Sequence, residues 1–429
     1  MFDLWQPVKL SEHVDIAIGG TPSRSMPAFW AEKPSGHAWL AISDLQAKYL
    51  RDTREHISDL GVRSSNVKLI PLGSTVMSFK LSVGRTAITA APMYSNEAIA
   101  AFLPRTGAVD GAWLYHVLPR AAKTVVTDSA VKGATLNKAK MAAMTVLLPS
   151  SDEQRTIAQI LDTLDTNIHQ TEAIIEKLKQ VKQGLLHDLL TRGIDANGEL
   201  RSPQSQAPHR YKDSPLGWIP REWRVAPLAE VASIRSGTTP ARSAASRYFA
   251  GGETAWVKTL DLNEGVILST DERVTDAALR ECSCERLPVG TVLIAMYGGW
   301  EQIGRTAMLG VPAATNQAIS ALVFGASDLE PEYVLRAMQH GRPRWASAAA
   351  STRKDPNITK ADVSAFCIPL PEGRDEQRRI VGTVRTALKR IGAEQLVLSK
   401  LQQQKSGLMD DLLTGRVRVT ALLDTEAPA

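Results

Sequence analysis

Two turn-rich loops in the first part of the chain carry side chains that can bind nucleic acid. Lysine and arginine neutralise phosphates, and arginine and asparagine hydrogen-bond to base edges in the major groove. Gly84 and Gly133 lie in these loops, where a glycine lets backbone amides approach a phosphate closely. We predict DNA contacts for Lys80, Arg85, Thr86, Lys132, Thr135, Asn137 and Lys138.

Loops at matching places later in the chain carry different side chains. Gln302 and Arg305 are residue types that read bases, whereas Trp300 either packs against the protein or contacts a base. The alternative for every candidate is a surface turn with solvated charges. The predicted contacts in this second set are Trp300, Gln302, Arg305, Arg353, Lys354 and Asn357.

No sequence pattern for catalysis accompanies these loops. The chain lacks an Asn/Asp-Pro-Pro-aromatic tetrapeptide for adenine methylation and a Gly-x-x-x-x-Gly-Lys-Ser/Thr loop for ATP. Cys282 and Cys284 make at most half of a zinc site, and His187 with Asp188 fits a solvated helix surface. We therefore predict a non-catalytic protein with no catalytic residues and no metal site.

Composition sets broad limits. The chain has 429 residues, of which 44% are hydrophobic and 22% charged, as in globular proteins. It has no apolar stretch long enough to cross a bilayer, and its three cysteines form no disulfide framework, so we predict a cytoplasmic protein. The net charge of +5 is compatible with nucleic acid but does not require it.

The chain contains the same unit twice, at an offset that grows from 217 to 223 residues. The short motif, or word, that starts at Gly19 recurs at Gly237, and Trp39 recurs as Trp256. The word Asp152-Glu153-Gln154-Arg155 recurs as Asp375-Glu376-Gln377-Arg378. Two long copies indicate a pseudo-dimer within one chain and argue against a solenoid. We assign the two matched tryptophans to the cores.

Each copy begins with short apolar runs separated by glycine and proline, which predicts a β-rich α+β domain. Helices are expected at Ala112–Pro119 and Pro331–Gly341. A long helix follows each domain, and Ser151 with Gln154 suggests a capping box at the start of the first one, with Gly193 as its C-cap. The expected segments are a domain at 1–150, a helix at 151–193, a linker at 194–217, a domain at 218–372, a helix at 373–417 and a flexible tail at 418–429.

Apolar residues in both long helices recur at alternating steps of four and three. This heptad pattern predicts that the two helices pair as a left-handed coiled coil rather than each packing separately on its own domain. Thr171 and Lys182 interrupt the first seam, and Glu394 and Lys405 interrupt the second at the same places. The apolar seam is Ile157, Leu161, Leu164, Ile168, Ile175, Leu178, Leu185 and Leu189 in the first helix, and Ile380, Val384, Ile391, Leu398, Leu401, Leu408 and Leu412 in the second.

A helix of this kind is ~57 Å long, which exceeds the ~34 Å of one DNA turn. If a pseudo-twofold axis relates the copies, the helices run antiparallel and separate two similar domains. Such a protein could read two half-sites with untouched bases between them.

These features together resemble the DNA-specificity (S) subunit of type I restriction-modification systems. The resemblance covers essentially the whole chain and rests on the tandem copies, on the words that open the two helices, and on Gly184 to Thr191 with its twin at the helix ends. It also rests on Gly133-Ala134-Thr135 and Asn316-Gln317-Ala318-Ile319. It implies two target-recognition domains that bind the halves of a split DNA site, and the divergence of the copies predicts an asymmetric site.

The resemblance also implies partners. These are double-stranded DNA, two modification subunits that bind S-adenosylmethionine and methylate adenine N6, and restriction subunits that use ATP and Mg²⁺. No cofactor is expected on this chain. Two other classes stay open, an enzyme with an unrecognised active site and a coiled-coil scaffold that does not bind DNA.

Overall fold

The computed structural model describes residues 5–105, 107–127, 136–325, 329–349 and 357–423. The chain divides into two compact units, the first formed by Met1–Ala173 with Leu396–Ala429 and the second by Ile174–Gln395. No helix within the described ranges has both the length and the apolar character of a membrane span. Four predicted contacts, Lys132, Thr135, Arg353 and Lys354, lie outside these ranges.

The first unit contains two sheets and a separate strand pair. The larger sheet has the order β2 (Val14–Ile18), β10 (Ile99–Pro104), β7 (Thr75–Ser78), β8 (Thr86–Thr89) and β5 (Tyr49–Leu50). The smaller has the order β3 (Trp30–Ala31), β6 (Glu55–Ile57), β4 (His37–Leu40) and β9 (Tyr94–Ser95). Strand β1 (Gln6–Lys9) pairs with β11 (Thr145–Leu148), directly before the long helix.

The second unit repeats this plan. Its larger sheet has the order β15 (Ser233–Ser236), β22 (Ile319–Val323), β19 (Val292–Ala295), β20 (Thr306–Leu309) and β17 (Val266–Ile267). A three-stranded sheet joins β18 (Arg273–Val274), β16 (Thr254–Val257) and β21 (Ala313–Thr315), and two strand pairs join β14 (Arg224–Pro227) to β23 (Cys367–Leu370) and β12 (Tyr211–Lys212) to β13 (Ile219–Pro220). The predicted α+β class and the tandem organisation are confirmed.

Short helices connect the strands and close the ends of the units. The α-helices are α1 (Leu10–His13), α2 (Asp59–Arg63), α4 (Lys138–Ala142), α6 (Leu228–Val231), α7 (Ala245–Tyr248), α8 (Asp276–Glu281), α10 (Trp345–Ala348), α11 (Lys360–Ala365) and α13 (Thr420–Leu423). The 3-10 helices are η1 (Pro27–Phe29), η2 (Ile42–Asp44), η3 (Pro208–Arg210), η4 (Arg242–Ala244), η5 (Thr259–Asp261) and η6 (Arg342–Arg344).

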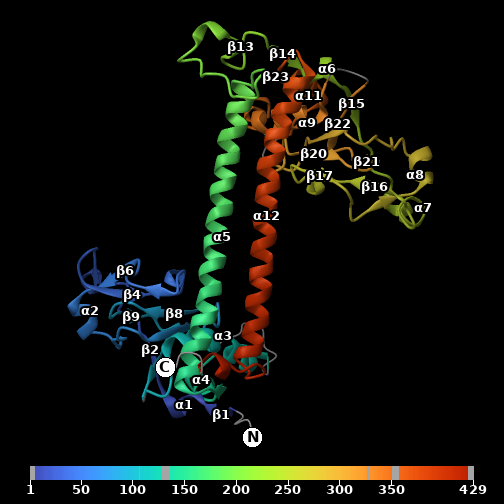
Figure 1. The fold of residues 1–429 in the computed structure, drawn as a ribbon. Helices are drawn as coiled ribbons and strands as arrows, with labels where there is room; N and C mark the ends of the chain where they lie inside the picture. Colours follow the sequence, from blue (N-terminus) through green and yellow to red (C-terminus); the bar gives the residue numbers. More distant parts are fainter. Residues whose placement is uncertain (1–4, 106, 128–135, 326–328, 350–356, 424–429) are drawn as a thin grey trace. The chain divides into compact units, whose positions relative to one another are not determined.

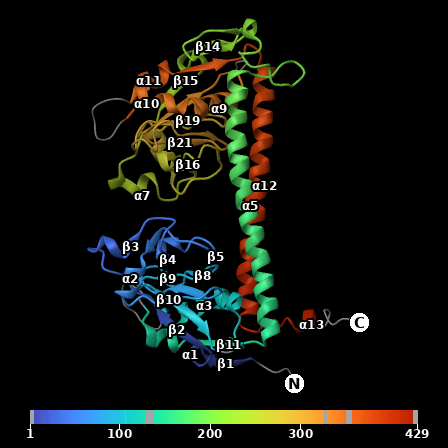
Figure 2. The ribbon, with the colours of Figure 1, turned by 90° about the vertical axis from the view of Figure 1, so that its left-hand side faces the viewer.

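One longer helix in each unit lies between the larger sheet and the long helices. It is α3 (Gly111–Thr127) in the first unit and α9 (Pro331–Gly341) in the second. Figure 2 shows α3 between the strands and α5 (Ser151–Thr191), and the same core joins Phe102 of the sheet, Leu114 of α3 and Leu161 of α5. The helix therefore attaches the sheet to the long helix.

Helix α3 does not end at Pro119, so the predicted end was wrong. Proline cannot donate a hydrogen bond to the carbonyl four residues earlier, which here belongs to Tyr115. The hydroxyl of Thr86 donates to that carbonyl over 2.9 Å, so the orphaned acceptor is satisfied by a neighbouring strand. This tertiary contact lets the helix continue to Thr127.

The long helices are α5 and α12 (Arg374–Leu412). The N-terminal capping box lies one residue earlier than expected, because the backbone N–H of Ser150 donates to Glu153 over 3.1 Å and the N–H of Glu153 donates to the Ser150 hydroxyl over 3.4 Å. Gln154 points into the domain instead and accepts from the N–H of Asp110 over 2.7 Å. Gly193 has φ +70°, as a glycine that ends a helix requires.

Within each unit a segment of α5 lies beside a segment of α12 and runs in the opposite direction (Figures 1 and 2). In the first unit Asp165 of α5 forms an ion pair with Lys405 of α12, and in the second unit Leu189 and Ile380 belong to one core. Every residue of the predicted seam is buried or half-buried, whereas most positions between them are exposed. This burial pattern fits paired helices, and a supercoiled spacer remains a prediction.

The words repeated in the sequence have matching structural roles. A Cβ atom at Gly19 would lie 2.1 Å from the carbonyl oxygen of Ser95, and one at Gly237 would lie 2.1 Å from that of Asn316, so only glycine fits at both places. Trp39 and Trp256 are both buried, which confirms their assignment to the cores. Each indole donates to a carbonyl of the repeated glycine-rich word, Gly20 and Thr238.

The segments after the two long helices are more ordered than a linker and a flexible tail. Beyond α12, Val419 is buried, Arg418 forms an ion pair with Glu153 at 2.7 Å, and α13 follows. Beyond α5, Arg201 forms an ion pair with Glu376 at 2.5 Å. The prediction of a flexible tail was therefore wrong for residues 418–423. Glu153, at the start of α5, binds this segment through Arg418.

Candidate nucleic-acid interface

In the first unit the structure brings together two loops that are far apart in sequence. The backbone N–H of Leu136 donates to the carbonyl of Phe79 over 2.9 Å, next to the β7–β8 loop. Lys80 and Arg85 of that loop therefore lie near the segment that carries Asn137 and Lys138. Arg85, Asn137 and Lys138 are exposed, and Lys80 is half-buried.

The second unit joins its two loops in the same way. The N–H of Ile358 donates to the carbonyl of Met296 over 3.0 Å, so Asn357 lies beside the β19–β20 loop. Trp300 at the tip of that loop is 56% exposed. Gln302 and Arg305 are half-buried and contact each other, with Arg305 Nη1 donating to Gln302 Oε1 over 3.3 Å.

Two of the predicted side chains are partly or wholly used inside the protein. Thr86 donates its hydroxyl proton to the carbonyl of Tyr115, as described above, so only its oxygen is left to accept a hydrogen bond from DNA. The amide oxygen of Asn137 accepts from the N–H of Lys140 over 2.8 Å and caps α4. Only the amide nitrogen of Asn137 is left to donate to DNA.

The two β-hairpin loops differ in charge. The first carries Lys80 and Arg85, whereas the second carries one acid, Glu301, and one base, Arg305. The larger segments show the same trend, with 16 basic and 11 acidic residues in 1–150 against 16 and 17 in 218–372. If the loops bind DNA, these charges predict stronger attraction of phosphate at the first loop and a larger role for side-chain shape and polarity at the second.

An arginine packed on two aromatic rings occurs in both units, and the sequence patterns did not single it out. The guanidinium of Arg24 lies 3.8 Å from the ring centre of Trp30, and that of Arg242 lies 4.3 Å from that of Phe249. Each also forms an ion pair with an acid, Arg24 with Glu55 and Arg242 with Glu272. Hydrogen bonds from Arg242 and Lys258 lower the pKa of Glu272 to about 2. Because all these charged groups are already paired within the protein, we infer that the two clusters are structural. They hold the repeated glycine-rich motifs that start at Gly19 and Gly237 in place.

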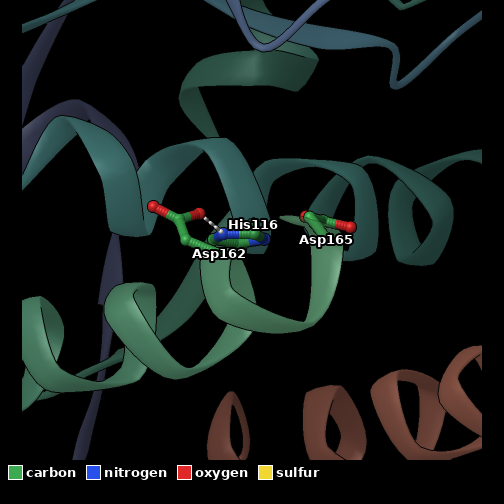
Figure 3. A group of neighbouring side chains, drawn as sticks. All are labelled: His116, Asp162 and Asp165. Carbon is green, nitrogen blue, oxygen red and sulfur yellow. Dashed lines mark hydrogen bonds and ion pairs between the residues drawn. The ribbon is translucent and has the colours of Figure 1, made fainter. Parts of the chain in front are cut away.

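A buried polar group attaches the first domain to the long helices (Figure 3). His116 of α3 is 2% exposed and lies 2.7 Å from Asp162 of α5, and Asp165 lies on the other side of its ring. Lys48 forms an ion pair with Asp162, and Lys405 of α12 forms one with Asp165. The group thus connects the loop before β5, helix α3 and both long helices.

The ring nitrogens of His116 and the carboxylate oxygens of Asp162 and Asp165 are of a kind that binds metal ions, and they lie within 4.8 Å of one another. Two lysine ammonium groups already neutralise the two carboxylates. A cation would have to compete with both of them. We therefore infer that His116, Asp162 and Asp165 have a structural role and do not form a metal site.

This group predicts a pH-dependent stability. Burial lowers the pKa of His116 despite its hydrogen bond to Asp162, while Lys48 opposes protonation and Asp165 favours it. As pH falls through the ordinary histidine value of ~6.5, the unfolded chain takes up this proton before the folded chain does, so the free energy of unfolding decreases. We expect His116→Gln to lose less stability between pH 7 and pH 5 than the wild-type protein.

Denaturant titrations at several pH values measure this difference. His169→Gln, at an exposed position of α5, is the control and should follow the wild-type curve. Parallel curves for His116→Gln and wild type would show that His116 does not supply the pH dependence.

Comparison with known proteins also divides the chain into two similar halves. The sequence profile of the type I restriction modification DNA specificity domain matches residues 3–180 and again residues 220–403. The chain belongs to this family. Both copies of the repeat are therefore DNA specificity domains.

Two relatives are named as specificity subunits of type I restriction enzymes. The MjaVIII type I restriction enzyme specificity subunit of Methanocaldococcus jannaschii is 23% identical over 437 residues, which cover 97% of this chain and 94% of the relative. The MjaIX specificity subunit of the same organism is 22% identical over 65% of this chain and 62% of its own length, so the chain spans under two thirds of that relative.

Among solved structures, the type I restriction-modification S subunit from M. genitalium has a TM-score of 0.56 at 13% identity. The match covers 96% of this chain and 97% of that one. At this identity the likeness shows the shared fold.

Proposed function

We propose that this chain is the DNA-recognition subunit of a type I restriction-modification enzyme and reads an asymmetric site in two halves. One observation carries the proposal. Two units with the same strand order each bring a β-hairpin loop next to a second loop, and the loops differ in side chains and charge. The same framework with different loop residues is what two unlike half-sites require.

The paired long helices would set the distance between the half-sites. Their seam residues are buried or half-buried along both helices, as the paired helices of a coiled coil require. A rod of fixed length then allows DNA contacts only at one spacing. This role rests on the proposed reading of two half-sites.

The subunit would also assemble the enzyme. We propose that it binds two modification subunits, which hold S-adenosylmethionine and methylate adenine N6, and restriction subunits that use ATP and Mg²⁺. The names of the MjaVIII and MjaIX relatives, specificity subunits of restriction enzymes, support this division of labour. A cytoplasmic location follows from the same proposal.

Binding and activity assays separate this function from the two alternatives. We expect the chain, assembled with its modification subunits, to bind DNA with an affinity that falls with salt and to support methylation only in their presence. Methylation or cleavage by the purified chain alone, with Mg²⁺ and S-adenosylmethionine, would indicate an enzyme. No DNA binding even at low salt would indicate a scaffold.

Arg85 provides a test of a single predicted contact. It is exposed in the β7–β8 loop, beside Lys80 and the segment after Leu136. If Arg85 reads a base, Arg85→Ala should weaken binding to the specific site by ~1–3 kcal/mol and relax selectivity at one position. Unchanged affinity together with an unchanged salt dependence would remove Arg85 from the interface.

A further inference from the structure

The β19–β20 loop of the second unit consists of a free part and a fastened part. Gly298 and Gly299 have φ of +109° and +76°, and Trp300 follows them with 56% of its surface exposed. From Glu301 onward the chain returns to the protein, and Ile303 is only 3% exposed within the core. The loop is three residues longer than its counterpart, because the repeat offset grows from 217 to 220 across it.

Arg342 of η6 fastens the returning part. Its Nη2 donates to the carbonyl of Glu301 over 2.6 Å, its Nε donates to the carbonyl of Ile303 over 3.2 Å, and its Nη1 donates to Glu264 Oε1 over 3.0 Å. One planar guanidinium thus holds two loop carbonyls and a carboxylate at once, in a fixed geometry that the compact ammonium of a lysine does not reproduce.

Packing completes the attachment one residue further on. Gly304 has φ +69°, and a Cβ atom there would lie 2.2 Å from Cδ1 of Trp345. Trp345 is itself 2% exposed and stacks on Phe366 with 4.1 Å between ring centres. The fastened part therefore lies directly on a rigid aromatic surface.

A hollow of about 420 Å³ borders Trp300. Its walls include Ile303, Pro343 and Trp345, with Arg342 and Glu264 at its polar edge. An exposed indole beside an apolar hollow would gain free energy by folding into it. The hydrogen bonds of Arg342 oppose this movement because they fix the carbonyls on either side of Gln302.

Among the residues of the first unit that the structure describes, no arginine holds the β7–β8 loop in this way. Ala122 occupies the place of Arg342, 220 residues earlier, and a Cβ atom at Gly84 would have no neighbour closer than 3.6 Å. The hydroxyl of Ser78 donates to the carbonyl of Ser82 instead, within the loop itself. The difference fits the charges, because the first loop offers two cations to phosphate whereas the second offers an indole.

We propose that Arg342 is a positioning residue for recognition of the half-site read by residues 218–372. It holds the β19–β20 loop in the conformation that presents Trp300 to DNA, where the indole packs against bases at a step it partly opens. The inference rests on the proposed DNA-recognition function and adds a residue that does not itself touch DNA.

The test uses the full chain assembled with its modification subunits. Methylation rates are measured on duplexes with the native site, with base changes in one half-site and with base changes in the other. We expect Arg342→Ala and Trp300→Ala each to reduce discrimination by about 10-fold in one half-site only, and the double variant to lose little more. Arg342→Lys should recover less than half of the discrimination that is lost in Arg342→Ala.

Arg224→Ala, which removes an exposed ion pair with Glu230 in the same unit, should behave as wild type. Wild-type discrimination by Arg342→Ala, equal losses in both half-sites, or additive effects of the two substitutions would each overturn the inference. If the wild-type complex itself showed no preference for any site, the proposed function would fail instead, so the two failures are distinguishable.

Discussion

Shortening both long helices by one heptad will abolish methylation of the native motif. Residues 168–174 of α5 and 396–402 of α12 lie next to the ion pair between Asp165 and Lys405, so their removal takes matched turns from both helices. Each helix becomes ~10 Å shorter, which is about three base pairs of DNA. Two recognition domains at the new spacing can no longer reach both original half-sites.

Mapping of methylated adenines in cells that express the shortened chain measures this effect. A motif with the same halves and a shorter gap, or no methylation at all, is expected. The control keeps the helix length and replaces exposed residues of the same turn by alanine, namely Asn167, His169, Gln170 and Glu172. An unaltered motif after the deletions would refute the role of the helices as a spacer.

Replacement of Glu376 by alanine will strongly destabilise the second unit. Its carboxylate accepts from Arg201 over 2.5 Å and 3.1 Å, from the indole of Trp223 over 3.2 Å and from the N–H of Ile194 over 3.0 Å. Burial opposes the charge of Arg201, but Glu376 keeps the arginine pKa raised. Removing only the acid takes the carboxylate from a largely buried cation and from two further donors, which costs at most ~3–5 kcal/mol of the free energy of unfolding.

Denaturant unfolding of the full chain tests this, with Asp375→Ala as the matched control. Asp375 is the preceding residue in the same helical turn, but its side chain is 84% exposed. We expect the control to change stability by less than about 0.5 kcal/mol. Equal effects of the two substitutions would mean that the buried contacts of Glu376 do not support the fold.

Local patterns in the sequence were sufficient to predict the framework. The seam of the long helices follows from spacing within one element, and the duplication follows from comparing the chain with itself. Gly19 and Gly237 show what the comparison of the two copies can predict, because the repeated glycine marks two places where a side chain cannot fit. The glutamates in the repeated word, Glu153 and Glu376, were visible in sequence, but their partners Arg418 and Arg201 were not.

Contacts between distant segments account for what the sequence did not predict. Thr86 donates to a carbonyl that Pro119 cannot satisfy, and the sequence of the loop gave no sign of this second role. Arg342 is 37 residues from the nearest residue of the loop that it fastens, and only the contrast with Ala122 in the other copy could have drawn attention to it. Such roles depend on which elements meet in the folded unit.

Genome-wide mapping of methylated adenine, in the host with and without this chain, tests the central claim most directly. The account predicts an interrupted motif with two unlike halves that is methylated only when the chain is present. Substitutions in the loop at 80–86 should change one half, and substitutions in the loop at 297–305 the other. Adenine methylation that does not depend on the chain, or that occurs at an uninterrupted motif, would contradict it.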